Sequence, residues 1–322
     1  MQETFSSLGK DAALEKLYEG KPFKPVSNPR FECADSFIST SSCTFLEGVD
    51  FDLSTFPLKH LGYKALVCAT GELMASLATP RTARVTISLS AKLDLPQVQE
   101  IWDGICEGAK SFGYEQLALD VVPSLTGLGI SICATGSCER KLAVSRPIAK
   151  SMDLICISNN PGASFLGSQI LSRKAAQQQK DLGAALEPYK QLVGAFLRPE
   201  LSPNVLKALK DSDIVPSFGY FCREHLSAVL RRLSRESGLG VKVYVDKIPF
   251  AGGSIDTARE LGVDPLQAAL KGGDDNCLLF TIPIGSHEKF RHDFQHWDII
   301  GHLAKKEVGT VVVSPDSLEH PV

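Results

Sequence analysis

Length and composition place this chain among folded globular proteins with room for two domains. It has 322 residues, of which 43% are hydrophobic and 22% charged, and its mean hydropathy is +0.01. A domain averages roughly 150 residues, and so apolar a composition can bury a core, which excludes an intrinsically disordered chain. The net charge of −3 and the pI near 6.2 give no positive field, so we expect no nucleic-acid partner.

The N-terminus and the cysteines bear on where the protein works. The first 17 residues carry acids early and lack an apolar stretch, so we expect no signal peptide. No run of about 18 apolar residues predicts a membrane span. The nine cysteines are odd in number and lack CxxC spacing. We therefore expect reduced cysteines, mostly in the core, and a cytoplasmic protein without a membrane partner.

The first half of the chain predicts a block of strands and helices in the order βαβαββ. A short N-terminal helix and a linker at 20 to 30 precede it. The expected elements are strands at 45 to 51 and 84 to 90, helices at 58 to 78 and after Pro96, and strands at 116 to 122 and 129 to 135. The helix after Pro96 is the clearest, because its apolar residues recur every three or four positions.

The second half forms another mixed block, after a hinge near 136 to 146. Its expected elements are a strand at 153 to 158, a helix opened by Pro161 and Gly162, a polar linker at 177 to 180, a helix at 222 to 236, and strands at 241 to 245, 277 to 283 and 310 to 314. The sequence therefore predicts an α+β protein of two domains, 1 to 140 and 141 to 322.

Common catalytic motifs are missing from the sequence. There is no GxxxxGK[ST] loop, no GxGxxG after a strand, no GxSxG and no HExxH. His292 and His296 have the i, i+4 spacing that can place two ligands on one metal. However, the segment 286 to 296 around them is polar on all sides, which favours a solvated helix.

Two carboxylates occupy positions where the pattern predicts burial. Glu72 falls on the apolar face of the helix expected at 58 to 78, and Asp120 interrupts the apolar strand LALDVV. A buried ionised carboxylate costs several kcal/mol unless a cation or hydrogen-bond donors compensate it. Metal binding and a structural hydrogen bond or salt bridge are both open as the compensation.

The segment KGGDDNCLLFTIP is the sharpest local pattern. Its two glycines and two aspartates lead directly into an apolar strand, so a flexible turn presents carboxylates at the strand's edge. A tight hairpin turn and a ligand site are both compatible with this pattern.

Taken in chain order, these segments resemble the thiamine-monophosphate kinases, a family of the aminoimidazole ribonucleotide synthetase superfamily. The family's GGEDYELLFTVP is matched by GGDDNCLLFTIP at 272 to 283, and its EGVHFDL by EGVDFDL at 47 to 53. Further similar segments are ALDVVPSLTGLGISI at 118 to 132, SRPIAKSMDLICIS at 145 to 158, LRPE at 197 to 200, SGLG at 237 to 240 and DIIGHL at 298 to 303. Together they cover essentially the full chain.

The resemblance implies a fold, a reaction and an assembly. The fold is aminoimidazole ribonucleotide synthetase-like, with an N-terminal α+β domain that dimerises through its sheet and a C-terminal α+β domain that closes over the nucleotide. The reaction transfers the γ-phosphoryl of ATP to thiamine monophosphate, with Mg²⁺ neutralising phosphate charge. ATP and Mg²⁺ are thus the implied cofactors, a phosphorylated small molecule the implied ligand, and a homodimer the implied assembly.

Only part of the family's carboxylate set is retained. The residues to which the resemblance assigns Mg²⁺ ligation are Glu32, Glu72, Asp120 and Glu224, of which Asp120 and Glu224 are also the implied catalytic residues. Cys33, Cys43 and Phe221 stand where the family pattern has aspartates. Since Mg²⁺ demands octahedral oxygen ligands, thiols and a phenyl ring are poor replacements, and the metal site is degraded or rebuilt.

The implied contacts to nucleotide and phosphate lie in both halves. They are Arg146, Gly162, Arg198, Asp274 and Asp275. Two departures affect this set: Pro161 removes an amide N–H that a phosphate could use, and Asp50 replaces the histidine of the family's VHF.

Two functions from different classes follow from the resemblance. The first is an active thiamine-monophosphate kinase in which the remaining acids hold Mg²⁺ and Arg146 and Arg198 steady phosphates. The alternative is a catalytically inactive paralogue, a dimeric module that binds a nucleotide or another phosphorylated ligand and acts by regulation. A different ATP-dependent enzyme of the superfamily is a third possibility.

Overall fold

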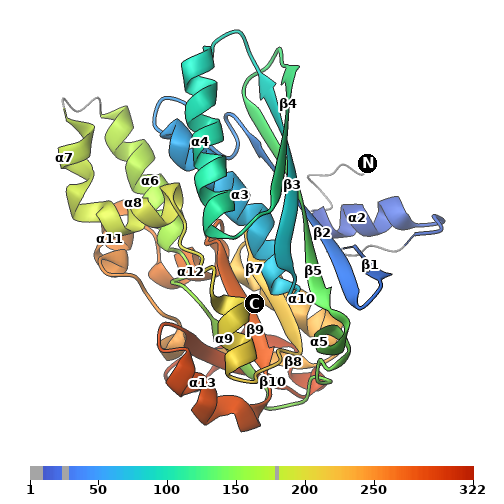
Figure 1. The fold of residues 1–322 in the computed structure, drawn as a ribbon. Coiled ribbons are helices and arrows are strands. Elements are labelled where there is room, and N and C mark those ends of the chain that lie inside the picture. The colour runs from blue at the N-terminus through green and yellow to red at the C-terminus, as the bar shows by residue number, and fades with distance from the viewer. Residues whose placement is uncertain (1–9, 24–28, 178–180) are drawn as a thin grey trace.

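The computed structural model of the protein describes residues 10 to 23, 29 to 177 and 181 to 322. Within them lie two β-sheets, one built from strands before residue 140 and one from strands after residue 153 (Figure 1). Most of the polar linker expected at 177 to 180, and part of the one expected at 20 to 30, fall outside the described residues.

The first sheet has five strands in the order β1-β2-β5-β3-β4. Their bounds are Arg30–Cys33, Ser36–Leu46, Gly129–Glu139, Thr79–Leu89 and Gln116–Pro123. All neighbours are antiparallel except β3 and β4. Side chains along β5 alternate between buried and exposed positions, so one face of the sheet covers the core.

Helices α3 (Leu58–Ala75) and α4 (Leu95–Ser111) pack together beside this sheet (Figure 1). Asp94 begins α4 with a capping box, because its side chain accepts the backbone N–H of Gln97. Glycines let the two helices cross almost in backbone contact: a Cβ at Gly62 would lie 2.0 Å from the carbonyl oxygen of Ile101.

The second sheet has seven strands in the order β12-β11-β8-β10-β6-β9-β7. Their bounds are Glu319–Pro321, Thr310–Val313, Gly240–Tyr244, Asp298–Ala304, Leu154–Ile157, Cys277–Ile282 and Phe218–Cys222. Only β11 and β8 run parallel. Every residue of β6 and β9 is buried, which explains why both strands appear in the sequence as unbroken apolar runs.

Short helices surround the second sheet, and a further helix lies near the N-terminus. They are α2 (Lys10–Tyr18), α5 (Arg140–Val144), α6 (Ala163–Ala176), α7 (Leu182–Leu186), α8 (Lys190–Leu197), α9 (Val205–Asp211), α10 (Leu226–Ser237), α11 (Ser254–Leu261), α12 (Pro265–Lys271) and α13 (His287–Asp293). Helix α10 ends at Gly238, whose φ of +69° closes the last turn.

Helix α3 connects the two halves, because it packs against β7 and β9 as well as against the first sheet. One hydrophobic core therefore contains residues of both halves, including Phe45 and Leu66 from the first and Phe221 and Phe280 from the second. Side chains on the far face of α3 reach the second sheet, and this is where the candidate site forms.

The structure confirms the expected α+β fold and corrects several details. Strand β2 starts at Ser36 rather than at residue 45. Asp120 is exposed, because β4 lies at the edge of its sheet, so the prediction that it is buried was wrong. Cys33 and Cys133 are exposed rather than in the core. Among the described residues, none of the helices combines the length and apolarity needed to cross a membrane.

Candidate functional site

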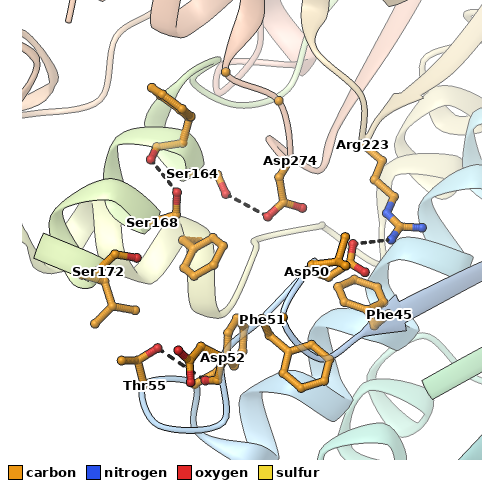
Figure 2. A pocket seen from close by; sticks show the side chains of 18 residues that line it. Phe45, Asp50, Phe51, Asp52, Thr55, Ser164, Ser168, Ser172, Arg223 and Asp274 are labelled. Atoms are coloured by element: carbon orange, nitrogen blue, oxygen red, sulfur yellow. Dashed lines mark hydrogen bonds and ion pairs between the residues drawn. The ribbon is translucent and has the colours of Figure 1, made fainter. Parts of the chain in front are cut away.

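A cavity of about 440 Å³ lies where the two halves meet (Figure 2). The loop after β2 forms one wall, α6 another, and the end of β7 and the turn before β9 a third. We call it the junction cavity. Its aromatic lining consists of Phe45, Phe51, Phe56, Phe165 and Phe196, and its charged lining of Asp50, Asp52, Asp274 and Arg223. The wall therefore combines aromatic rings with polar side chains and an excess of negative charge.

The turn at 272 to 276 carries Asp274 into this cavity. Gly273, Asp274 and Asn276 have φ angles of +82°, +58° and +51°, a region that glycine, aspartate and asparagine tolerate best. The N–H of Asp274 donates to the carbonyl of Arg223 at 2.9 Å, which fastens the turn to the end of β7. The turn joins α12 to β9, so the hairpin interpretation of KGGDDN was wrong.

The buried side chain of Lys64 balances the negative charge of Asp274. This lysine is fully buried on α3, and Nζ donates to Asp274 Oδ2 at 2.5 Å and to the carbonyl of Phe196 at 2.7 Å. The ammonium also lies 4.1 Å from the ring centroid of Phe196. A buried cation needs such partners, so Lys64 fixes the carboxylate of Asp274 in one position.

Arg223 and Asp50 form the second ion pair of the cavity. Arg223 Nη2 donates to Asp50 Oδ1 at 3.2 Å, as Figure 2 shows, and to the carbonyl of Thr44 at 2.8 Å. Asp50 Oδ2 in turn accepts the N–H of Leu46 at 2.8 Å. The guanidinium lies 4.6 Å from the ring centroid of Phe45. These contacts place a cation at the cavity wall.

Asp52 adds a third carboxylate to the wall. It accepts the N–H and the hydroxyl of Ser54 at 2.8 and 2.7 Å, and these hydrogen bonds lower the pKa of Asp52. The side chain is therefore ionised at neutral pH.

Two of the positions where the family pattern has aspartates, Cys43 and Phe221, are buried neutral groups. Burial raises the pKa of the Cys43 thiol to about 12, and this thiol donates to the carbonyl of Ala65 at 3.1 Å. Phe221 is 3% exposed, and its ring occupies the space beside Gly71 on α3. In the described part of the chain, no group of three or more His, Cys, Asp or Glu side chains could hold a metal ion.

The four predicted Mg²⁺ ligands do not gather in the junction cavity. Glu32 is exposed on β1 and pairs with Arg140. Asp120 is exposed on β4 and pairs with Arg84 at 3.5 Å. Glu72 on α3 and Glu224 just after β7 are half-buried. Their metal role remains a prediction.

The two histidines with i, i+4 spacing do not share a helix face. Helix α13 ends at Asp293, so His292 lies in the helix and His296 lies beyond it. The predicted solvated helix is present, although its Phe290 is buried.

The predicted nucleotide contacts are partly brought together, because Arg198 and Asp275 line one smaller cavity and Gly162 is bonded to Asp275. The N–H of Gly162, at the start of α6, donates to Asp275 Oδ1 at 2.7 Å, so the chain's own carboxylate already uses it. Arg198 donates to Glu107 at 2.6 Å, away from the junction cavity. Arg146 is half-buried, and among the described residues its Nη2 has no hydrogen-bond partner.

Asp275 is a buried carboxyl whose second oxygen, Oδ2, has no partner among the described residues. It lines a smaller cavity of about 290 Å³ that shares Ser164 with the junction cavity. Burial, and to a lesser extent the neighbouring charge of Asp274, raises the pKa of Asp275 well above its ordinary value. The carboxyl therefore retains its proton to a higher pH in the folded protein than in the unfolded chain.

We expect Asp275→Asn to stabilise the protein increasingly as the pH rises. Because the folded-state pKa is raised, the folded protein holds a proton that the unfolded chain loses near pH 4, and the free energy of unfolding falls above that pH. Asparagine keeps an acceptor for the N–H of Gly162 and cannot ionise. Urea unfolding measures the free energy of unfolding of the variant and of the wild type at pH 4.5 and at pH 8. The advantage of the variant over the wild type should be larger at pH 8, by on the order of 1 kcal/mol. A difference independent of pH would contradict this.

Comparison with known proteins finds similar thiamine-monophosphate kinases. No protein-family model matches it. A thiamine-monophosphate kinase of Aquifex aeolicus is 24% identical over 271 residues, 84% of this chain and 83% of that protein. Another, of Rhodopirellula baltica, is 27% identical over 243 residues, 75% of this chain and 67% of that protein.

Over most of its length the chain is similar to thiamine-monophosphate kinases. Solved structures show the same fold. The structure of AaThiL complexed with AMPPCP and TMP covers 99% of this chain and 97% of its own, with a TM-score of 0.84 and 21% identity. The hydrogenase maturation protein HypE in complex with ATP covers 88% of this chain and 83% of its own, with a TM-score of 0.65 and 16% identity. The relatives support a kinase-like function.

Two charged residues at the cavity were not singled out by the sequence analysis. Lys64 sits in the middle of an apolar helix, where its charge is itself the signal of a buried partner. Arg223 occupies the third position of the stretch that corresponds to the family's DxSDG, a place where the pattern has no cation. In both cases the sequence signal is a positive charge at a position where the surrounding pattern has none.

Proposed function

We propose that the chain is a kinase-like protein that binds a thiamine-class phosphate ester in the junction cavity without the magnesium carboxylates of its family. The observation that carries this proposal is the cavity wall. Aromatic rings lie beside the carboxylates of Asp50, Asp52 and Asp274, and Arg223 is the one cation that the described residues contribute to the lining.

This wall suits a ligand that carries both charges. A planar cationic heterocycle is attracted to aromatic faces and to carboxylates, and a phosphate is attracted to a guanidinium. Thiamine monophosphate combines a thiazolium ring with a phosphate group. The similar structure of AaThiL is complexed with AMPPCP and TMP, which supports the assignment.

A nucleotide site fits this chain better than a magnesium site does. The similar proteins bound to AMPPCP and ATP support nucleotide binding. Mg²⁺ requires oxygen ligands at about 2.0–2.1 Å. The neutral thiol of Cys43 and the ring of Phe221 do not meet that requirement.

Ligand binding and turnover test this function separately. In EDTA, thiamine monophosphate at about 100 times its dissociation constant should raise the free energy of unfolding by about 2.7 kcal/mol. With ATP and Mg²⁺, ADP release should stay below about 0.01 s⁻¹, against the 1 s⁻¹ or more of ordinary enzymes. The absence of any stabilisation by thiamine monophosphate would overturn the proposal.

A magnesium-dependent kinase is the second candidate, and one observation favours it. Glu72 follows Gly71, which contacts Phe221, and Glu224 comes three residues after that ring, so two half-buried acids remain near the junction. Mg²⁺ often needs only one or two carboxylates together with substrate phosphates. Turnover near 1 s⁻¹ that disappears in Asp120→Asn would establish this function instead.

A further inference from the structure

Arg223 brings a positive charge into the stretch 221 to 225, where the family pattern DxSDG has two aspartates at other positions. It follows Phe221 by two residues, directly after β7, and its side chain reaches the wall of the junction cavity, where it is 30% exposed. The Phe45 ring beneath the guanidinium is itself 2% exposed, so the cation rests on a fixed apolar surface. Its position is therefore defined by packing as well as by charge.

The guanidinium is held in a way that leaves two of its nitrogens for a ligand. Both hydrogen bonds, to Thr44 and to Asp50, use Nη2, so neither engages the N–H groups of Nε and Nη1. Each of these N–H groups can donate a charge-assisted hydrogen bond to a phosphate oxygen. The guanidinium is thus a preorganised hydrogen-bond donor for an anion.

Asp50 and Arg223 depart from the family pattern together. Asp50 stands where the family has histidine, and Arg223 falls within the stretch matching DxSDG. The two positions are 173 residues apart in the chain, yet they meet at 3.2 Å. Asp50 is in turn anchored by the N–H of Leu46. The two changes therefore form one charged unit.

The other charges around the cavity favour one position for the phosphate of a ligand, beside Arg223. Asp52 and Asp274 present carboxylates on other parts of the wall, and Lys64, which compensates Asp274, is fully buried beneath it. A phosphate near Asp52 or Asp274 would meet like charge. The cationic ring of the ligand is favoured there instead, and the phosphate at Arg223.

We infer that Arg223, braced by Asp50, binds the phosphate of the cavity ligand directly and without a metal ion. This inference rests on the proposed function. It assigns to Arg223 the neutralisation of phosphate charge that Mg²⁺ provides in the family pattern. The arginine makes the site selective for the phosphorylated form of the ligand. Asp50 acts as a positioning residue.

Calorimetric binding of thiamine monophosphate and of thiamine, each in EDTA and in Mg²⁺, tests this inference. We expect Arg223→Gln to weaken the binding of thiamine monophosphate by about 10- to 100-fold and that of thiamine by less than about threefold. Arg223→Lys should fall between, because it keeps the charge and loses the planar guanidinium. EDTA should leave the wild-type affinity unchanged.

The control is Arg259→Gln, which removes an exposed arginine that is ion-paired to an aspartate on α11. It should change neither affinity, and circular dichroism should show all variants folded. Equal weakening of both ligands in Arg223→Gln, or wild-type binding of thiamine monophosphate that EDTA abolishes, would overturn the inference while leaving ligand binding intact. Failure of the wild type to bind either ligand would overturn the proposed function as well.

Discussion

Replacing Asp274 by asparagine should lower the free energy of unfolding by about 3 kcal/mol, more than replacing its partner Lys64 does. The asymmetry follows from burial, because the side chain of Lys64 is fully buried whereas that of Asp274 is 33% exposed. Asp274→Asn leaves an ammonium ion without its counter-charge in the core. Lys64→Met leaves a carboxylate that water can still reach, and we expect it to cost about 1–2 kcal/mol.

Urea unfolding at pH 7 measures both variants and the double variant. Asparagine suits the positive φ of position 274, so backbone strain does not enter the comparison. The double variant should lose less than the sum of the two single losses, since it removes both charges. Lys190→Met, which breaks an exposed pair with Glu187, is the control and should leave the free energy of unfolding nearly unchanged. A larger loss from Lys64→Met than from Asp274→Asn would contradict the burial argument.

Introducing a methyl group at Gly71 should also destabilise the protein, by about 2 kcal/mol. A Cβ at this position would lie 2.2 Å from ring carbons of Phe221, which is itself buried. Overpacking of this kind usually costs about 1–3 kcal/mol, and the gain of about 1 kcal/mol in helix propensity on changing glycine to alanine offsets only part of a clash this severe.

Removing the ring should reverse the sign of the Gly71→Ala effect. In a Phe221→Ala background the clash is gone, so Gly71→Ala should stabilise the protein by up to about 1 kcal/mol through helix propensity alone. Denaturation of the four chains in the cycle, wild type included, gives the coupling directly. Destabilisation that persists without the ring would show that Gly71 is needed for another reason.

The sequence predicted much of the fold because periodicity reports burial on one face. The helix expected after Pro96 is α4, and the strand expected at 277 to 283 is β9. The strand expected at 45 to 51 overlaps β2 only at its end, because the alternating serines and threonines of SFISTSS hide a strand whose inward side chains are small and polar. Ser41, for example, is buried and donates to the carbonyl of Ala69.

The site was harder to predict than the fold. Asp120 sits in an apolar run, but only the order of strands reveals that β4 is at an edge, where a carboxylate remains in water. Arg223 and Asp50 meet across 173 residues, a pairing that no local pattern contains. The dimer through the first sheet stays a prediction. So does the domain boundary at residue 140.

Helix α3 couples the unfolding of the two halves of the chain. Its Leu66 belongs to the same core as Phe280 of β9, and its Lys64 is the counter-ion of Asp274. Neither half can melt without exposing apolar surface of the other and leaving a buried charge unpaired. Heat or denaturant therefore meets one cooperative unit, and whatever occupies the cavity between the halves protects the whole chain from unfolding at once.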